Sequence, residues 1–246
     1  MNGSPDRGSV PATPAPGARR LLVWLVLALL VGGALAAYVW WSRPSEQRCE
    51  AARKAIDALG CKATLSAGEL DIEASTDFDD EKLAKLAGHA RDCDSVLLKL
   101  KGTRVSAGGL DGLKKLTNLR QLDLSGLSLT DDSLAALSGL DRLEQLDLSR
   151  TGIGDDGLRH LKSLKALRRL ILDGNPKVTS AGLAHLLGLS ELRDLRLSGT
   201  RVDDAGLRKL AELKQLEKLW LKDVPGVTEA GIDELKKALP ELSVKR

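Results

Sequence analysis

Aromatic residues are scarce in this chain: only 2% of its 246 residues are Phe, Trp or Tyr. Most of them lie in one short stretch, at Trp24, Tyr38, Trp40 and Trp41. Only Phe78 and Trp220 remain for the rest of the chain, so a core there has to be built from aliphatic side chains, mainly leucine. With 43% hydrophobic and 29% charged residues, the composition excludes a chain that is wholly disordered or wholly embedded in a membrane.

An excess of charge of one sign is also lacking. The net charge is +3, and residues 42–246 hold 34 basic and 33 acidic side chains. A protein that binds nucleic acid needs a basic face to neutralise phosphates. The balance of charges therefore predicts no nucleic-acid partner.

Cysteine is rare, with three residues and no zinc-ligand spacing. Cys49 and Cys61 bracket a predicted helix that would hold them roughly 18 Å apart, which is too far for a disulfide. Cys61 and Cys93 each precede a predicted strand, so they could pair in an exported domain. The alternative is three free thiols.

The sequence also lacks a phosphate-binding loop, a nucleophile elbow and a metal-binding motif. His160 and His185 occupy the same position in neighbouring repeats, which could suggest a metal site. In the other repeats that position holds Gly112, Ala136, Lys209 and Glu234. Such a mixture indicates an outward helix surface, so we expect a non-catalytic protein without metal or cofactor.

The N-terminal region contains the one long uncharged run. The first residues are rich in Pro, Gly, Ala and Ser, so residues 1–20 are predicted to form a disordered cytoplasmic tail. Residues 21–41 would span roughly 30 Å as a helix, which predicts a single transmembrane helix in the lipid bilayer. Ala34-Leu35-Ala36 leaves a cleavable signal peptide as the alternative. Arg19 and Arg20 favour a cytoplasmic N-terminus. Both interpretations place the C-terminal domain outside the cytoplasm, in the periplasm or at the cell surface.

The remainder of the chain is repetitive. Six units and a terminal stub follow the pattern L-x-x-L-x-L, beginning at Ser95, Leu119, Leu143, Leu167, Leu192, Leu216 and Leu242. Residues 122–124 show the alternation that predicts a strand with leucines on one face. Leu134, Leu137 and Leu140 show the three-residue steps that predict a helix with an apolar stripe. Stacked units bury these leucines against one another, which a single unit cannot do.

Simple geometry predicts the shape of the stack. Neighbouring strands lie about 4.8 Å apart and packed helices about 8–10 Å apart, so the stack has to curve with a parallel sheet on its concave face and helices on its convex face. A column of small residues is expected to let each helix begin close to the sheet: Gly109, Ser133, Gly157, Gly182, Gly206 and Gly231. Paired acids at 131–132, 155–156 and 203–204 precede helices, and we interpret them as helix caps rather than calcium ligands.

Residues 192–215, LRDLRLSGTRVDDAGLRKLAELKQ, show the pattern clearly. In this pattern, residues 95–246 resemble leucine-rich repeat proteins of the 24-residue bacterial class. The resemblance implies an α/β solenoid that serves as a protein-binding scaffold. Proteins of this class usually have asparagine at the turn after the strand. Here that position holds Thr103, Leu127, Thr151, Asn175, Thr200 and Val224, so asparagine is present in one unit of six. A complete ladder of turn side chains is therefore not expected.

Residues 44–94 are less regular and are predicted to form an N-terminal cap that shields the first repeat. Residues 45–60 and 77–90 predict helices, and residues 61–65 and 69–74 predict two short strands.

The concave face is the main candidate for a binding surface. Its two outward columns hold Lys99, Asp123, Asp147, Ile171, Arg196 and Trp220, and Leu97, Gln121, Gln145, Arg169, Asp194 and Lys218. Exposed aromatic residues and arginines often carry binding energy, so we hypothesise that Trp220, Arg196, Arg169 and Ile171 contact a protein. The alternative is a solvated face on which Trp220 covers the last unit.

Together these features predict a membrane-anchored leucine-rich repeat protein that acts as a non-catalytic scaffold for protein–protein interaction. The alternative is a structural envelope protein without a specific partner.

Overall fold

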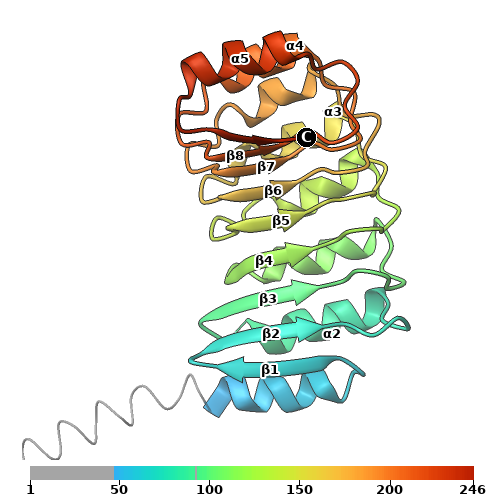
Figure 1. Ribbon diagram of the computed structural model, residues 1–246. Coiled ribbons are helices and arrows are strands. Elements are labelled where there is room, and N and C mark those ends of the chain that lie inside the picture. The colour runs from blue at the N-terminus through green and yellow to red at the C-terminus, as the bar shows by residue number, and fades with distance from the viewer. Residues whose placement is uncertain (1–46, 92) are drawn as a thin grey trace, which may run out of the picture. The chain divides into compact units, whose positions relative to one another are not determined.

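The computed structural model describes residues 47–91 and 93–246. Their strands form one sheet in the order β1 to β9, so each strand lies beside its neighbours in sequence (Figure 1). β1 is antiparallel to β2, and every later pair is parallel. The strands are β1 (Lys62–Ser66), β2 (Glu69–Glu73), β3 (Ser95–Lys99), β4 (Leu119–Asp123), β5 (Gln145–Asp147), β6 (Arg169–Ile171), β7 (Asp194–Arg196), β8 (Lys218–Trp220) and β9 (Ser243–Lys245).

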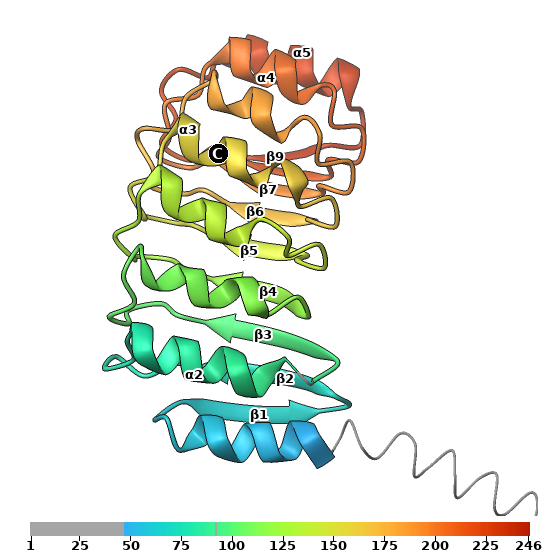
Figure 2. The same ribbon diagram turned by 180° about the vertical axis from the view of Figure 1, so that it is seen from behind.

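Helical segments connect the strands and cover one face of the sheet (Figure 2). They are a helix at residues 47–57, α2 (Asp80–Ala90), η1 (Gly109–Lys115), η2 (Asp131–Leu137), α3 (Asp155–Leu158), η3 (Arg159–Ser163), η4 (Gly182–Leu186), α4 (Asp204–Leu210) and α5 (Glu229–Ala238). Those labelled η are 3₁₀-helices. A 3₁₀-helix has three residues per turn, so leucines at three-residue steps share one edge of it. The predicted helices are therefore present, several of them in this tighter form.

The core is one continuous aliphatic layer between the sheet and the helices. Leu122 and Leu124 of the β4 unit and Leu134 and Leu137 of η2 are at most 2% exposed, and the same pattern recurs in each unit. Burying one leucine fully contributes roughly 1.5–3 kcal/mol, so this layer is the main source of stability. The predicted stacking of leucines between units is confirmed.

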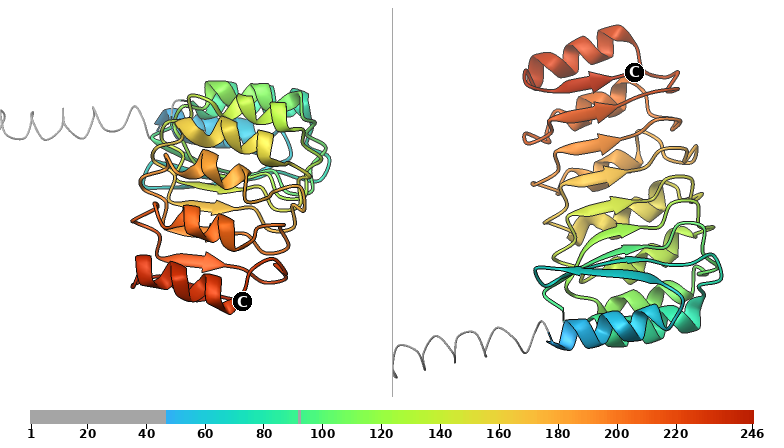
Figure 3. Two further views of the ribbon diagram at one scale, coloured as in Figure 1. Left: turned by 90° about the horizontal axis from the view of Figure 1, so that it is seen from above. Right: turned by 60° about the horizontal axis from the view of Figure 1, so that its bottom comes forward.

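The sheet lies on the inner side of the stack. Figures 1 and 3 show the helix at residues 47–57 and α5 lying beyond the strands at the two ends of the stack. The helices therefore spread over a wider arc than the strands, as the two spacings require. The uncovered face of the sheet is the concave face.

The paired acids mostly do not cap their own helices, which corrects the sequence interpretation. Three of them accept a backbone N–H from the next unit, at 2.6, 2.7 and 2.9 Å: Asp131 from Gly154, Asp155 from Thr179 and Asp204 from Thr228. Of the six, Asp203 accepts from the third helical residue of its own segment, Gly206, as a cap does. In a stack, the backbone of the next unit lies as near to these carboxylates as their own helix does.

The column of small residues makes room for these carboxylates. A Cβ atom at Gly182 would lie 2.3 Å from Oδ1 of Asp155, and one at Gly231 would lie 2.1 Å from Oδ1 of Asp204. The column was predicted to bring helix and sheet together. At four of its five glycines the closest contact is with an acid of the preceding unit or of the cap, and at Gly206 it is with Ser180.

The turn after each strand has an incomplete ladder of side chains, as expected. Thr103, Thr151 and Thr200 each donate a hydrogen bond to the carbonyl three residues earlier. Asn175 is fully buried and bridges two units. Leu127 and Val224 fill the same position with apolar side chains that are 3% exposed.

Residues 47–91 and 93–94 close the N-terminal end of the core. β1, β2 and α2 lie where strands and a helix were predicted, and Asp79 caps α2 by accepting the N–H of Lys82. Phe78 is fully buried beneath them.

Cys49 and Cys61 are not bonded to each other, as predicted, but the Cys61–Cys93 pair and the alternative of three free thiols were both wrong. Cys49 and Cys93 form a disulfide, with Cα atoms 5.0 Å apart, and Cys61 is a buried free thiol. Because β1 is antiparallel to β2, and β2 is parallel to β3, Lys62 pairs with Glu73 and Glu73 with Lys99. The start of β1 therefore lies level with the end of β3 and not with its start, which separates Cys61 from Cys93.

The predicted tail at 1–20 and transmembrane helix at 21–41 lie outside the described residues. Within residues 47–91 and 93–246, no helix has the length and apolar character needed to cross a membrane.

Candidate functional site

Strand register brings all the predicted site residues onto the concave face. Pairing of β3 to β8 aligns Lys99, Asp123, Asp147, Ile171, Arg196 and Trp220 in one column. The neighbouring column aligns Leu97, Gln121, Gln145, Arg169, Asp194 and Lys218. Except for the exposed Lys99 and Lys218, these side chains are half-buried, while the leucines between the columns are buried. The face is thus a mainly polar surface, interrupted by Leu97, Ile171 and Trp220, over a layer of buried leucines.

The N-terminal part of this face is a shallow hollow of about 180 Å³, whose lining includes two bases, Lys99 and Arg169, and two acids. Its acidic side chains are Asp123 and Asp147, each of which accepts the backbone N–H two residues later at 2.8 Å. Lys99 lies at the end of the hollow and forms an ion pair with Asp71 of the cap at 3.0 Å. The two aspartates are therefore held in place by the backbone, and Lys99 is engaged by the cap.

The C-terminal part holds a cluster around Trp220. The indole N–H donates to Oδ1 of Asp194 at 3.1 Å, and Cζ of Arg196 lies 4.4 Å from the ring centroid as a cation–π contact. Nε of Arg169 lies 3.1 Å from Oδ2 of Asp194, which is close enough for an ion pair, although its N–H lacks the angle of a hydrogen bond. Asp194 thus joins Trp220 and Arg169, and Arg196 joins them by stacking on Trp220, so three of the four residues predicted to form a contact patch lie in one cluster.

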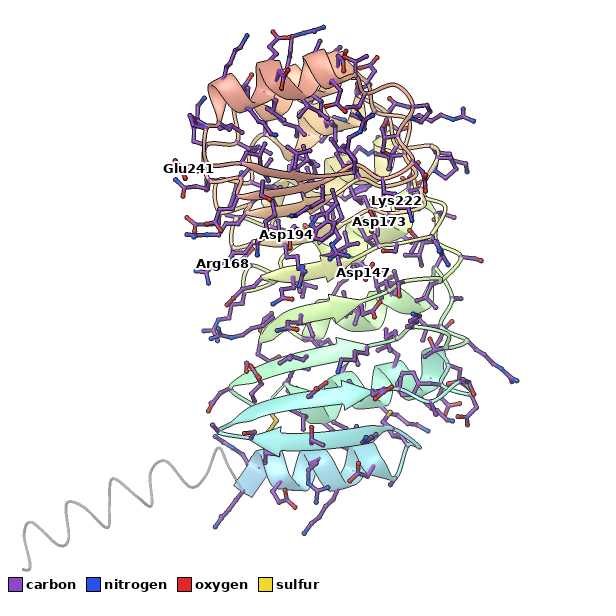
Figure 4. All side chains as sticks on the ribbon, viewed as in Figure 1. Asp147, Arg168, Asp173, Asp194, Lys222 and Glu241 are labelled. Atoms are coloured by element: carbon purple, nitrogen blue, oxygen red, sulfur yellow. A yellow bond between two sulfur atoms is a disulfide. The ribbon has the colours of Figure 1, made fainter. Side chains whose placement is uncertain are left out.

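Asp194 was the member that sequence reasoning left out of the patch. Figure 4 labels it on the sheet face in the C-terminal half of the stack. The signal lies in the repeat alignment, which places Asp194 in the unit after Arg169 and in the unit before Trp220. An acid between these two residues is a shared partner for both. Ile171 lies beside Arg196 in the register.

A second hollow, of about 450 Å³, lies at the carboxyl ends of the later strands and is called the basic hollow here. Its lining contains five basic and two acidic side chains: Arg150, Arg196, Lys222, Lys245 and Arg246, with Asp173 and Asp223. Trp220 forms part of its wall. Figure 4 labels Lys222 and Asp173 at this edge of the sheet. Of this lining, Arg196 and Trp220 were predicted site residues.

The histidines face the helix side of the stack. Nε2 of His160 lies 3.9 Å from Asp132, and His185 is exposed. Among residues 47–91 and 93–246, no three His, Cys, Asp or Glu side chains are grouped as metal ligands would be. Ala136, in the same column, is buried, so this helix surface is not outward in every unit.

Comparisons with known proteins agree with this architecture. Residues 143–162 and 190–211 match the Leucine Rich repeat family model. The structure is similar to internalin C2 of Listeria monocytogenes, with a TM-score of 0.56 and 24% identity over 80% of each chain. It is also similar to an internalin, inlF, of the same organism, with a TM-score of 0.52 and 19% identity over 66% of this chain and 49% of that one. A search of the curated proteins found no match. The fold is a leucine-rich repeat solenoid.

Proposed function

We propose that this chain is a membrane-anchored, non-catalytic scaffold that binds a protein on the concave face of its repeats, outside the cytoplasm. The observation that carries the proposal is the register of β4 to β8. It places Asp123, Asp147, Ile171, Arg196 and Trp220 side by side on a face that no described segment covers. Leucine-rich repeats commonly present such a concave surface to partners.

The arrangement of the Trp220 cluster supports a binding role. Asp194 and Arg196 hold the indole ring in one orientation before any partner arrives. A ring that is already ordered loses little conformational entropy on binding. Trp and Arg are the residue types that most often dominate interface energies.

The disulfide supports a location of the repeat domain outside the cytoplasm. Disulfides persist in oxidising environments and are rare in the cytosol. Cys49–Cys93 lies in the described part of the chain that follows the uncharged run at residues 21–41. Both features favour an exported repeat domain with a membrane anchor at its N-terminus.

Site-specific photo-crosslinking of the full chain in its own cells tests the binding face. A crosslinker at Gln121 or Gln145 on the sheet is expected to yield one discrete adduct. The matched positions Lys162 and Lys237, exposed on the helix face, are expected to yield none. Equal or absent adducts from both faces would favour a structural envelope protein instead.

Localisation has its own tests. Maleimide trapping in intact cells is expected to find Cys49 and Cys93 oxidised, and reduced cysteines would place the repeats in a reducing compartment. Deleting residues 21–41 is expected to abolish membrane retention. The N-terminal mass of the mature protein separates the two explanations of that segment, because cleavage after Ala36 would mean a signal peptide.

A further inference from the structure

We propose that the basic hollow binds an extended acidic segment of a protein partner, with carboxylates at alternate positions. This inference rests on the proposed function and specifies the chemistry of the partner at one end of the concave face. It is carried by unpaired charge, by the spacing of the strands that bear the cations and by a strained cationic residue in the lining.

Several cations in the hollow lack an opposite charge. No carboxylate of the described residues lies within ion-pair distance of Arg150, Lys222 or Lys245. Of the two acids in the lining, Asp173 accepts the backbone N–H of Ser198 at 2.8 Å. Uncompensated cations grouped in a concavity attract an anion, because the low-dielectric walls strengthen the field.

Arg196 adds a second unsatisfied group. Its guanidinium is stacked on Trp220, and its Nε is buried without a hydrogen-bond partner. A buried donor that is left unpaired is costly, and a ligand oxygen would satisfy it. Arg246 contributes less, because it already contacts Glu229 and the carbonyl of Val227.

Two residues of the lining occupy strained backbone positions. The position just after each strand turn has positive φ, and most units place glycine there: Gly102, Gly126, Gly174 and Gly199. The two exceptions are Arg150, with φ of 54°, and Asp223, with φ of 56°. Both line the basic hollow. Non-glycine residues in this conformation concentrate at functional sites. At Arg150 the strained residue adds a cation to the hollow, which an acidic ligand requires.

The side chain of Arg150 reaches across the neighbouring unit. Its Cγ atom lies 2.7 Å from the point that a Cβ atom on Gly174 would occupy, so the missing side chain of Gly174 provides the path. The Arg150 and Lys222 units are three strands apart, or roughly 14 Å at the usual strand spacing. In an extended peptide, side chains four residues apart on one face are separated by roughly 13 Å. The backbone positions of Arg150 and Lys222 are therefore about as far apart as two such side chains, so an extended acidic peptide lying across the strands can contact both units.

The direct test uses the full chain in non-ionic detergent and two labelled synthetic peptides. One alternates Glu with Ser over eight residues, and the other replaces every Glu with Gln. Fluorescence anisotropy is expected to show saturable binding of the Glu peptide that weakens as salt is raised, and no binding of the Gln peptide. Equal affinity for the two peptides, or no binding of either, would overturn the proposal.

Arg150→Gly and Asp223→Gly form a matched pair of variants. Each relieves the same backbone strain, but they remove opposite charges from the hollow. We expect Arg150→Gly to weaken binding of the Glu peptide about tenfold and Asp223→Gly to strengthen it several-fold. Lys237→Gln, on the exposed side of α5, is expected to leave it unchanged. Shifts of the two glycine variants in the same direction would refute the role of the hollow.

The failure of this inference can be separated from that of the proposed function. If the crosslinker at Gln145 captures a partner while the Glu peptide does not bind, the concave face binds a protein of different chemistry. If neither occurs, both proposals fail.

Discussion

Replacing Asn175 with alanine should destabilise the solenoid more than any other single change at the turn after a strand. The side-chain amide is fully buried and makes four hydrogen bonds to backbone groups. It donates to the carbonyls of Leu148 and Leu172 at 2.8 and 3.0 Å, and it accepts from the N–H groups of Thr151 and Gly152 at 3.1 and 2.9 Å. At about 1 kcal/mol for each bond, with the partners left unsatisfied, the expected loss is about 3–5 kcal/mol. The free energy of unfolding of a typical domain is roughly 5–15 kcal/mol, so this loss is a large part of it.

Thr200→Ala is the matched control, because Thr200 occupies the same position in the next unit. Its side chain makes one hydrogen bond to the backbone, to the carbonyl of Leu197 at 2.6 Å. Its loss should be about 1 kcal/mol. Asn175→Leu separates hydrogen bonding from volume, since Leu127 shows that a leucine fits this position in another unit. Urea unfolding of the full chain in detergent, followed by far-ultraviolet circular dichroism, measures all three. If Asn175→Ala costs no more than Thr200→Ala, the inter-unit bridge contributes nothing and the reasoning is wrong.

Three further predictions concern the cap and the acids. Replacing Cys49 and Cys93 with alanine should lower the free energy of unfolding by up to about 4 kcal/mol, because the disulfide closes a loop with a sequence separation of 44. Urea unfolding measures this loss, and an unchanged midpoint would contradict it. Burial raises the pKa of Cys61 to about 11, so iodoacetamide at pH 8 should modify it only after unfolding, as mass spectrometry can show. The backbone N–H of Thr228 holds the pKa of Asp204 below its usual value. This stabilisation is present above the unfolded aspartate pKa of about 3.9 and is lost as pH falls through the folded value, so the melting temperature should fall below about pH 4, and less so in Asp204→Asn.

The strand register was predictable because the leucine spacing permits one alignment. Shifting a strand by one residue would turn its leucines to solvent, so Ile171 had to lie beside Arg196 even though their units differ in length by one residue. The extra residue falls in the loop near Pro176, where it does not disturb the pairing. The three-residue leucine steps also match the three-residue turn of the 3₁₀-helices that several units contain.

Contacts that depend on direction or on a neighbouring unit could not be predicted in the same way. The separation of Cys61 from Cys93 follows from the antiparallel direction of β1, which the hydrophobic pattern does not encode. Asp131 precedes a helix and so resembles a cap, but the N–H group it binds belongs to Gly154 in the next unit. Local sequence rules compare a residue with its own segment. In a repeat stack, the backbone N–H that an acid binds can belong to the next unit, as it does for Asp131, Asp155 and Asp204.

A repeat protein provides an internal control for every position, because the same structural demand recurs in each unit. Where most units place glycine at positive φ, a different residue costs roughly 1–2 kcal/mol without serving the stack. Arg150 and Asp223 both bear this strain, and Trp220 is the one aromatic residue among the six strands that open the repeat units. All three line the basic hollow. The fold explains neither Arg150 nor Trp220, whereas an anionic ligand in the hollow accounts for both the cation and the aromatic wall; Asp223 opposes such a ligand and is not explained by it.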